Sequence, residues 1–255
     1  MWEQDKFLHK THIKTAWERE LFYSIMYPPN MTVKWLDTDK PESATYKKDI
    51  KYTFNEYGFR SDSFNDRGEI NILTCGCSHT VGVGVDQHEA WPFVLKAMLE
   101  EKTGKKVVVW NLATSGASPD YVLRSVYKTL QTLKPDYVCV YWPPTERTEM
   151  PDINDERFLA QSFLHDSNFP KTYVNERWLI DYVFMKNLVA IEAIVPWYNA
   201  KFIANKNINI ALESLEGDYF APDTDARDGL HPGPEWHKRT AEFYLKSINT
   251  ILANR

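Results

Sequence analysis

The chain has 255 residues, of which 43% are hydrophobic and 25% charged, as in an ordinary globular protein. A chain of this length buries roughly 70–75% of its unfolded surface and needs no disulfide framework. Its net charge of −5 provides no basic field for phosphate backbones, which argues against nucleic-acid binding as a main role. The three cysteines show no framework spacing and are expected to be free thiols.

The N-terminus begins with polar residues and shows no apolar segment of the kind that directs secretion. No stretch of the sequence approaches the ~18 apolar residues that a membrane span needs. We therefore expect a soluble, cytoplasmic protein that does not act at a membrane.

Residues 1–66 show the least regular pattern. A helix is expected over about residues 4–26, and a strand with a turn over residues 51–60, where Asn55 and Gly58 supply the turn chemistry. We interpret this part as an N-terminal accessory extension packed on a main domain of residues 67–255.

From residue 69, apolar runs that are typical of strands alternate with helical patterns. A helix is expected from Trp91 to Gly104, and another begins at Ser118-Pro119, which offers a capping hydroxyl and a proline at the first helical position. The alternation predicts a three-layer α/β/α fold with a mainly parallel sheet. The expected strands are residues 69–75, 107–110 and 137–142.

The C-terminal part is expected to be mostly helical over residues 150–206, with a break at Pro196. A fourth strand is predicted over residues 207–212 and a last helix from Pro234. The sheet would then have four or five strands.

Residues suited to nucleophilic catalysis follow these strands. Reaction sites in a doubly wound sheet form past the carboxyl ends of the strands, and Ser78 and Gly116 follow the first and second strands. Asp228 and His231 lie three residues apart before the last helix. A serine hydroxyl needs a base, which histidine provides, and a carboxylate fixes the tautomer of that histidine. Ser78, His231 and Asp228 are therefore the candidate nucleophile, base and orienting acid.

The same stretches resemble the SGNH/GDSL family of serine hydrolases. The pattern Gly-x-Ser-x-Thr-x-Gly-x-Gly-Val at residues 76–85 is similar to the first block of that family, residues 111–116 to the second, and residues 228–232 to the fifth. The resemblance covers residues 67–255. It implies a flavodoxin-like SGNH hydrolase fold, esterase activity, and no metal or organic cofactor. It also implies that the backbone N–H groups of Ser78 and Gly116 form the oxyanion hole.

One element of the family pattern is missing. The third block of the family holds an asparagine that completes the oxyanion hole, whereas no asparagine or glutamine lies between Gln131 and Asn154. Thr145 is the candidate replacement. Trp142 and Arg147 are expected to line the substrate pocket, where Arg147 would hold a substrate carboxylate or phosphate, or else pair with the neighbouring Glu146.

Two features beside the nucleophile are assigned structural roles. His79 directly follows Ser78, and its side chain is expected to point elsewhere. Gly82 and Gly84 lack the third glycine and the Lys-Ser/Thr of a phosphate-binding loop, so no nucleotide site is predicted.

Three functions are compatible with this pattern. The leading hypothesis is hydrolysis of a carboxylic ester that carries a small acyl group on a carbohydrate or similar polar carrier. A catalytically attenuated scaffold that binds an acylated glycan or a protein partner would account for the missing asparagine. Acyl transfer to an acceptor alcohol would use the same nucleophile and the same first half-reaction.

Overall fold

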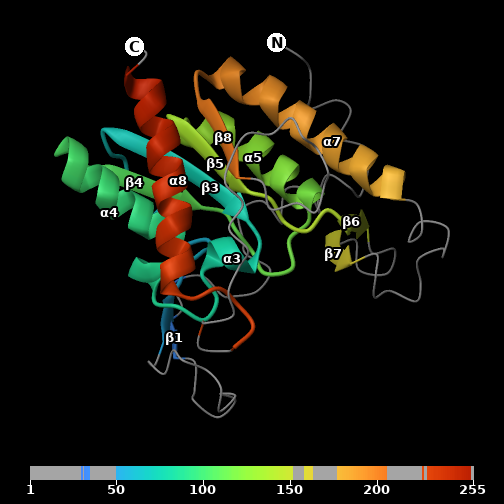
Figure 1. The fold of residues 1–255 in the computed structure, drawn as a ribbon, viewed down its shortest axis with the longest axis horizontal. Coiled ribbons are helices and arrows are strands. Elements are labelled where there is room, and N and C mark those ends of the chain that lie inside the picture. Colours follow the sequence, from blue (N-terminus) through green and yellow to red (C-terminus); the bar gives the residue numbers. More distant parts are fainter. Residues whose placement is uncertain are drawn as a thin grey trace.

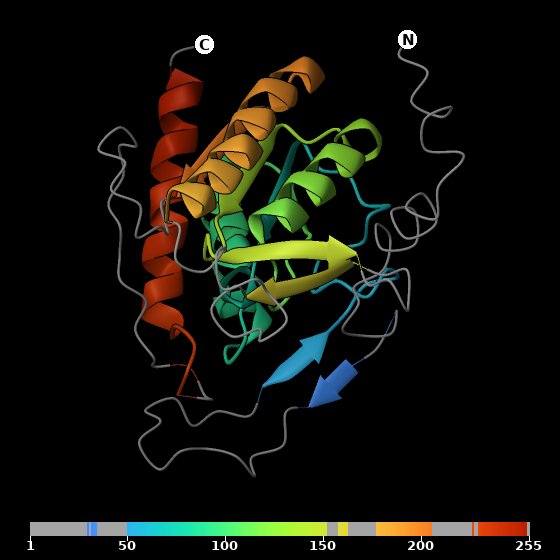
Figure 2. The same ribbon diagram turned by 90° about the vertical axis from the view of Figure 1, so that its right-hand side faces the viewer.

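The computed structural model describes residues 30, 32–34, 50–151, 158–162, 177–205, 226 and 229–253. Within these ranges a four-stranded parallel sheet has helices on both faces (Figure 1, Figure 2). The predicted helix over residues 4–26 and the predicted strand over residues 207–212 lie outside the described residues.

The sheet has the strand order β4-β3-β5-β8, and all neighbouring strands are parallel. In chain order these are the second, first, third and fourth strands, which is the flavodoxin-like doubly wound order. The predicted three-layer α/β/α fold is therefore confirmed. The strands are β3 (Ile70–Gly76), β4 (Val107–Asn111), β5 (Tyr137–Tyr141) and β8 (Lys201–Asn205).

The strands are apolar throughout because both faces of the sheet are covered. Every residue of β4 and β5 is buried. Val107 and Val109 belong to the core on one face, whereas Val108 and Trp110 belong to the core on the other. Burial at this level accounts for the solid apolar runs from which the strands were predicted.

In the described part of the chain, two long helices cover each face of the sheet. Helices α4 (Trp91–Thr103) and α8 (Pro234–Ala253) share one core with the sheet, and α5 (Pro119–Leu133) and α7 (Arg177–Ile194) share the other (Figure 1). Among the described helices, none combines the length and the apolar character that a membrane crossing requires.

The helix ends follow the capping signals in the sequence. The hydroxyl of Ser118 accepts a hydrogen bond from the N–H of Tyr121 at 3.2 Å and so caps the start of α5. Helix α4 ends at Gly104, whose φ of +68° is the left-handed conformation that glycine adopts without steric cost. Both predicted boundaries are confirmed.

An antiparallel pair precedes the sheet, formed by β1 (Thr32–Lys34) and β2 (Lys51–Thr53). After β2, the side-chain oxygen of Asn55 accepts hydrogen bonds from the N–H groups of Tyr57 and Phe59, each at 3.0 Å. This local bonding forms the turn that the sequence predicts.

Residues 50–66 pack directly onto the main fold. Phe59 and Phe64 are 3% and 7% exposed and belong to the core beneath α5. The N–H of Asp62 donates to the carbonyl of Val109 in the edge strand β4. The domain boundary at residue 66 remains a prediction, and Phe59 and Phe64 contribute to the same core as the sheet.

The prediction of a mostly helical segment over residues 150–206 is wrong in part. Helix α7 and the 3₁₀ turn Val195–Tyr198, which contains Pro196, agree with it. However, β6 (Arg147–Pro151) and β7 (Phe158–Ser162) form an antiparallel hairpin, and residues 201–205 form β8. Asn199 ends the helical region in a left-handed conformation with φ of +59°, a stop signal that the sequence interpretation overlooked.

Candidate active site

Ser78 is the first residue of the short helix α3 (Ser78–Val81), which directly follows β3. Gly76, at the end of β3, is paired in register with Tyr141 at the end of β5. Within the parallel sheet, β3 and β5 are the first and third strands in chain order. Ser78 therefore lies at the topological switch point of this sheet, where doubly wound proteins bind ligands. The side chain of Ser78 is 8% exposed.

Gly76 allows α3 to fold back closely on the sheet. A Cβ atom at this position would lie 2.3 Å from the hydroxyl of Thr80 and 2.5 Å from the carbonyl oxygen of Tyr141. Both distances are below any normal contact, so only glycine fits between the nucleophile turn and β5.

The loop after β4 lies beside this turn. The N–H of Thr114 donates to the carbonyl of Gly76 at 3.3 Å, and Ala117 donates to the carbonyl of Thr114 at 3.3 Å to close a tight turn. Gly116 is the third residue of that turn and has a φ of +75°, which the position requires and glycine permits. The nucleophile turn and the loop with Gly116 are thus joined by a hydrogen bond at the carboxyl ends of β3 and β4.

The amide of Asn111 joins these segments. Its Nδ2 donates to the carbonyl of Arg60 at 3.2 Å and to that of Thr80 at 3.1 Å. Its Oδ1 accepts from the hydroxyl of Thr74 at 3.0 Å and from the N–H of Ala113 at 3.2 Å. Asn111 is 1% exposed, and its amide is fully used in holding α3 against the loop after β4.

His231 lies near the nucleophile turn. The ring of His79, the residue after Ser78, meets the ring of His231 edge-on with 5.8 Å between centroids. His79 also contacts Trp236 at 5.7 Å and Tyr141 at 6.0 Å. The sequence interpretation gave His79 a structural role and a side chain that points elsewhere, and it did not anticipate that this ring would lie against the ring of His231.

Asp228 lies outside the described residues. The segments on either side of it are described: the N–H of Gly229 donates to the carbonyl of Ala226 at 2.9 Å, and the N–H of Ala226 donates to that of His231 at 3.0 Å. These bonds hold Ala226, Gly229 and His231 close together before α8. The role of Asp228 remains a prediction.

The residues after β5 occupy two environments. Thr145 is 4% exposed in the loop at this edge. Trp142 is 1% exposed, and its ring packs against Phe184 of α7 with 5.0 Å between centroids. Arg147 opens β6, and its Nη1 atom is buried without a hydrogen-bond partner among the residues that the structure describes.

Buried polar contacts fix the hairpin that follows. Arg124 of α5 forms a bidentate ion pair with Glu149 of β6, and both side chains are almost fully buried. Asp120 accepts hydrogen bonds from the hydroxyl of Thr148 at 2.7 Å and from the amide of Asn187 at 3.0 Å. The start of the hairpin, with Arg147, is therefore held against α5 and α7.

The thiols of Cys75 and Cys139 are not suited to nucleophilic chemistry. Cys75, Cys77 and Cys139 are free and buried. Burial raises the pKa of the Cys75 thiol to about 12 and raises the pKa of Cys139 still further. Both thiols are therefore protonated at neutral pH and cannot attack a substrate.

One group of potential metal ligands occurs among the described residues. Asp86, His88 and Glu89 present ligand atoms within 4.8 Å of one another around the 3₁₀ turn Gln87–Glu89. The carboxylate of Glu89 already accepts a hydrogen bond from the N–H of Asp86 at 3.0 Å, as in a capping box. This arrangement has an adequate explanation in local turn structure.

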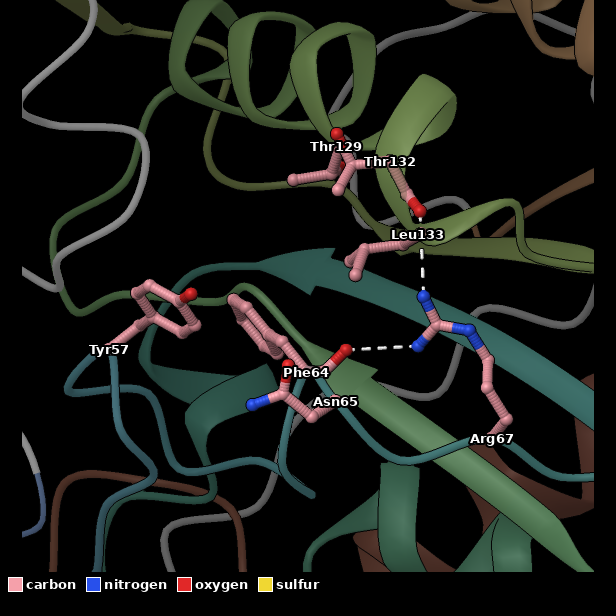
Figure 3. Close-up of a pocket in the computed structure, with 7 residues that line it drawn as sticks. All are labelled: Tyr57, Phe64, Asn65, Arg67, Thr129, Thr132 and Leu133. Atoms are coloured by element: carbon pink, nitrogen blue, oxygen red, sulfur yellow. Dashed lines mark hydrogen bonds between the residues drawn. The ribbon is translucent and has the colours of Figure 1, made fainter.

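A pocket of about 310 Å³, shown in Figure 3, lies at the end of the sheet away from Ser78. It is bordered by Arg67, which precedes β3, and by Leu133, which ends α5, so it opens at the amino ends of the strands. The pocket is separate from Ser78 and His231. Its lining residues are Tyr57, Phe64, Asn65, Arg67, Thr129, Thr132 and Leu133.

No protein-family model matches the sequence, and no curated protein matches it. Similar solved structures include TesA, with 16% identity over 70% of this chain and 97% of that chain, at a TM-score of 0.43. A family 3 carbohydrate esterase from Clostridium thermocellum has 18% identity over 72% and 98%, at 0.36. A putative lipolytic protein of the G-D-S-L family from Desulfitobacterium hafniense has 13% identity over 70% and 99%, at 0.32.

Proposed function

We propose that the protein is a serine hydrolase that cleaves a carboxylic ester, with a small acyl group on a carbohydrate or similar polar carrier. The observation that carries this proposal is the position of Ser78, which begins a helix at the switch point of a parallel sheet. The loop with Gly116 and the residue His231 lie near the same turn.

In this mechanism the hydroxyl oxygen of Ser78 attacks the ester carbonyl while His231 accepts its proton. The N–H groups of Ser78 and Gly116 donate to the oxyanion of the tetrahedral intermediate. Collapse of the intermediate breaks the bond to the alcohol, which leaves with the proton from His231. Water then attacks the acyl-enzyme by the same route, releases the acid and restores Ser78. Asp228 orients His231 and stabilises its charged form.

The preference for a polar substrate is supported by the loop after β5. Thr145 and Arg147 are polar groups at the edge where the ester would bind, and the buried Nη1 of Arg147 has no acceptor in the described part of the chain. A buried donor without a partner costs about 1–3 kcal/mol, which an acceptor on the substrate would offset. Arg147 therefore contacts an oxygen or an anionic group of the substrate.

Labelling with a fluorophosphonate probe tests this function. Wild-type protein should gain the mass of one probe molecule on Ser78, and Ser78→Ala should gain none. Ser247→Ala is the matched control, because this hydroxyl donates to the carbonyl of Phe243 within α8, and it should be labelled like the wild type. Labelling that persists in Ser78→Ala would reject Ser78 as the nucleophile.

The products separate the remaining functions. With a short-chain ester, hydrolysis releases free acid, whereas acyl transfer gives a new ester when an acceptor alcohol is added. A wild-type protein that neither reacts with the probe nor releases acid would contradict the enzymatic proposal and favour the binding scaffold.

A further inference from the structure

Arg60 lies in the segment before the parallel sheet, yet its guanidinium group contacts the loop that follows Ser78. Its Nη1 donates to the carbonyls of Val81 and Gly82, and its Nη2 donates to the carbonyl of Val85 at 2.8 Å. The side chain is 2% exposed. Burying a guanidinium is costly unless its donors find acceptors, and here backbone carbonyls accept from both terminal nitrogens.

Tyr52 of β2 completes the contact. The guanidinium carbon of Arg60 lies 4.4 Å from the centroid of the Tyr52 ring, within the range of a cation–π interaction. The hydroxyl oxygen of Tyr52 accepts a hydrogen bond from the N–H of Gly84 at 2.7 Å. Arg60 and Tyr52 together therefore bind the backbone of residues 81–85 on both its carbonyl and its N–H groups.

This loop is bonded to the nucleophile itself. The carbonyl of Ser78 accepts hydrogen bonds from the N–H of Gly82 at 3.0 Å and from that of Val83 at 3.1 Å. Helix α3 has only four residues and ends at Gly82, so few bonds of its own hold it. The orientation of Ser78 therefore depends on the loop that Arg60 binds.

The same loop reaches the segment that carries the histidine. Val85 is fully buried and packs in a small cluster with Ala90, Phe93 and Ala226. The N–H of Ala226 donates to the carbonyl of His231 at 3.0 Å. A shift of residues 81–85 would thus be transmitted to both Ser78 and His231.

We infer that Arg60 is a positioning residue of the active site, and that Arg60 and Tyr52 hold the Ser78 turn in its reactive geometry. The inference rests on the proposed function for its catalytic part. It gives the segment before the sheet a specific role: the segment supplies the cation that orders the nucleophile, rather than serving only as a cover on the core.

The test compares Arg60→Ala, Arg60→Lys and Tyr52→Phe with Arg67→Ala. Arg67 is a matched control because its guanidinium carbon also lies over an aromatic ring, 4.6 Å from the centroid of Trp110. It likewise donates hydrogen bonds to backbone carbonyls (Figure 3), but it precedes β3 and so lies at the end of the sheet away from Ser78. Lysine keeps the charge of Arg60 but lacks the planar fork that reaches three carbonyls.

The Arg60 variants should lose roughly tenfold to hundredfold in the rate of probe labelling and in kcat, as expected when a reacting group is misplaced by about 1 Å. KM should change little, because Arg60 does not touch the substrate. Guanidinium chloride at millimolar concentration should restore part of the rate in Arg60→Ala, and sodium chloride should not. Arg67→Ala should react at the wild-type rate.

Hydrogen exchange over residues 78–86 provides a readout that is independent of activity. Faster exchange of this segment in Arg60→Lys and Tyr52→Phe, with little change in Tm, would support the inference. Wild-type exchange or wild-type labelling rates in both variants would overturn it. If the wild type itself is not labelled, the proposed function fails, and the exchange data alone decide whether Arg60 orders the turn.

Discussion

His237, on α8, is a fully buried histidine that the reaction does not use. Its Nδ1 accepts a hydrogen bond from the N–H of Trp91 at 3.2 Å and so caps the first turn of α4. Its pKa is lowered from 6.5 to about 3, mainly by burial and also by electrostatic repulsion from His79, Arg60 and His231. His237 is therefore neutral in the folded protein at neutral pH, and protonation would destroy the cap and bury a charge.

This shift makes the stability of the protein depend on pH. The unfolded chain takes up a proton on His237 below pH 6.5, whereas the folded chain does not until about pH 3. The stability that this neutral group contributes is complete above pH 6.5 and is lost progressively as the pH falls toward 3. Between pH 6.5 and pH 3, each pH unit lowers the free energy of unfolding by about 1.4 kcal/mol. The fall from pH 7 to pH 5 therefore removes about 2 kcal/mol.

Urea unfolding of the wild type and of His237→Asn at pH 7, 6 and 5 measures this effect. Asparagine keeps an acceptor near the position of Nδ1 but does not titrate. The stability difference between the two proteins should therefore narrow by about 2 kcal/mol between pH 7 and pH 5. A difference that stays constant over this range would refute the assignment of His237 as a neutral, buried cap.

Three further substitutions test the geometry of the site. Gly76→Ala should lower the free energy of unfolding by about 1–3 kcal/mol, because its Cβ would overlap the carbonyl oxygen of Tyr141, and an unchanged Tm would contradict this packing. Thr145→Val should lower kcat for a short-chain ester by roughly 10²–10³-fold if its hydroxyl is an oxyanion donor, and an unaltered kcat would exclude that role. Arg147→Met should raise KM roughly tenfold for an ester that bears a carboxylate and leave a neutral ester unaffected, since it removes a charge-assisted hydrogen bond. Equal effects on the two esters would argue against a specific anion contact.

The central part of the fold could be predicted because its signals are local. The valines of β4 are buried on both faces, and this double burial produces the solid apolar run that was recognised in the sequence. Ser118 and Gly104 act through bonds and dihedral angles within their own helix ends, so their residue types suffice to mark boundaries. The position of Ser78 could be predicted for the same reason, because Ser78 comes shortly after the carboxyl end of the first predicted strand.

The later elements could not be predicted because tertiary contacts decide them. Strand β8 has five residues and, among the described strands, pairs only with β5, so its short pattern was assigned to the helix before it. The hairpin of β6 and β7 is held by Arg124 and Asp120, side chains of α5 more than twenty residues away in the chain. Nothing in residues 147–162 alone reveals these partners.

The role of Arg60 was invisible in the sequence for a related reason. Its acceptors are the carbonyls of Val81, Gly82 and Val85, which every residue carries, so no residue type marks the partner. A buried cation is normally sought beside a carboxylate. Only the approach of two distant segments makes these carbonyls converge on one side chain.

The third donor of the proposed oxyanion hole can be considered against the contacts of Asn111. Asn111, the last residue of β4, is a buried side-chain amide that lies against the Ser78 helix through Thr80. Both of its N–H groups are already used, one by the carbonyl of Arg60 and one by that of Thr80. Asn111 therefore cannot donate to an oxyanion without releasing α3, on which the position of Ser78 depends. The candidate for a third donor in the proposed oxyanion hole is therefore Thr145 in the loop after β5, and Thr145→Val is its test.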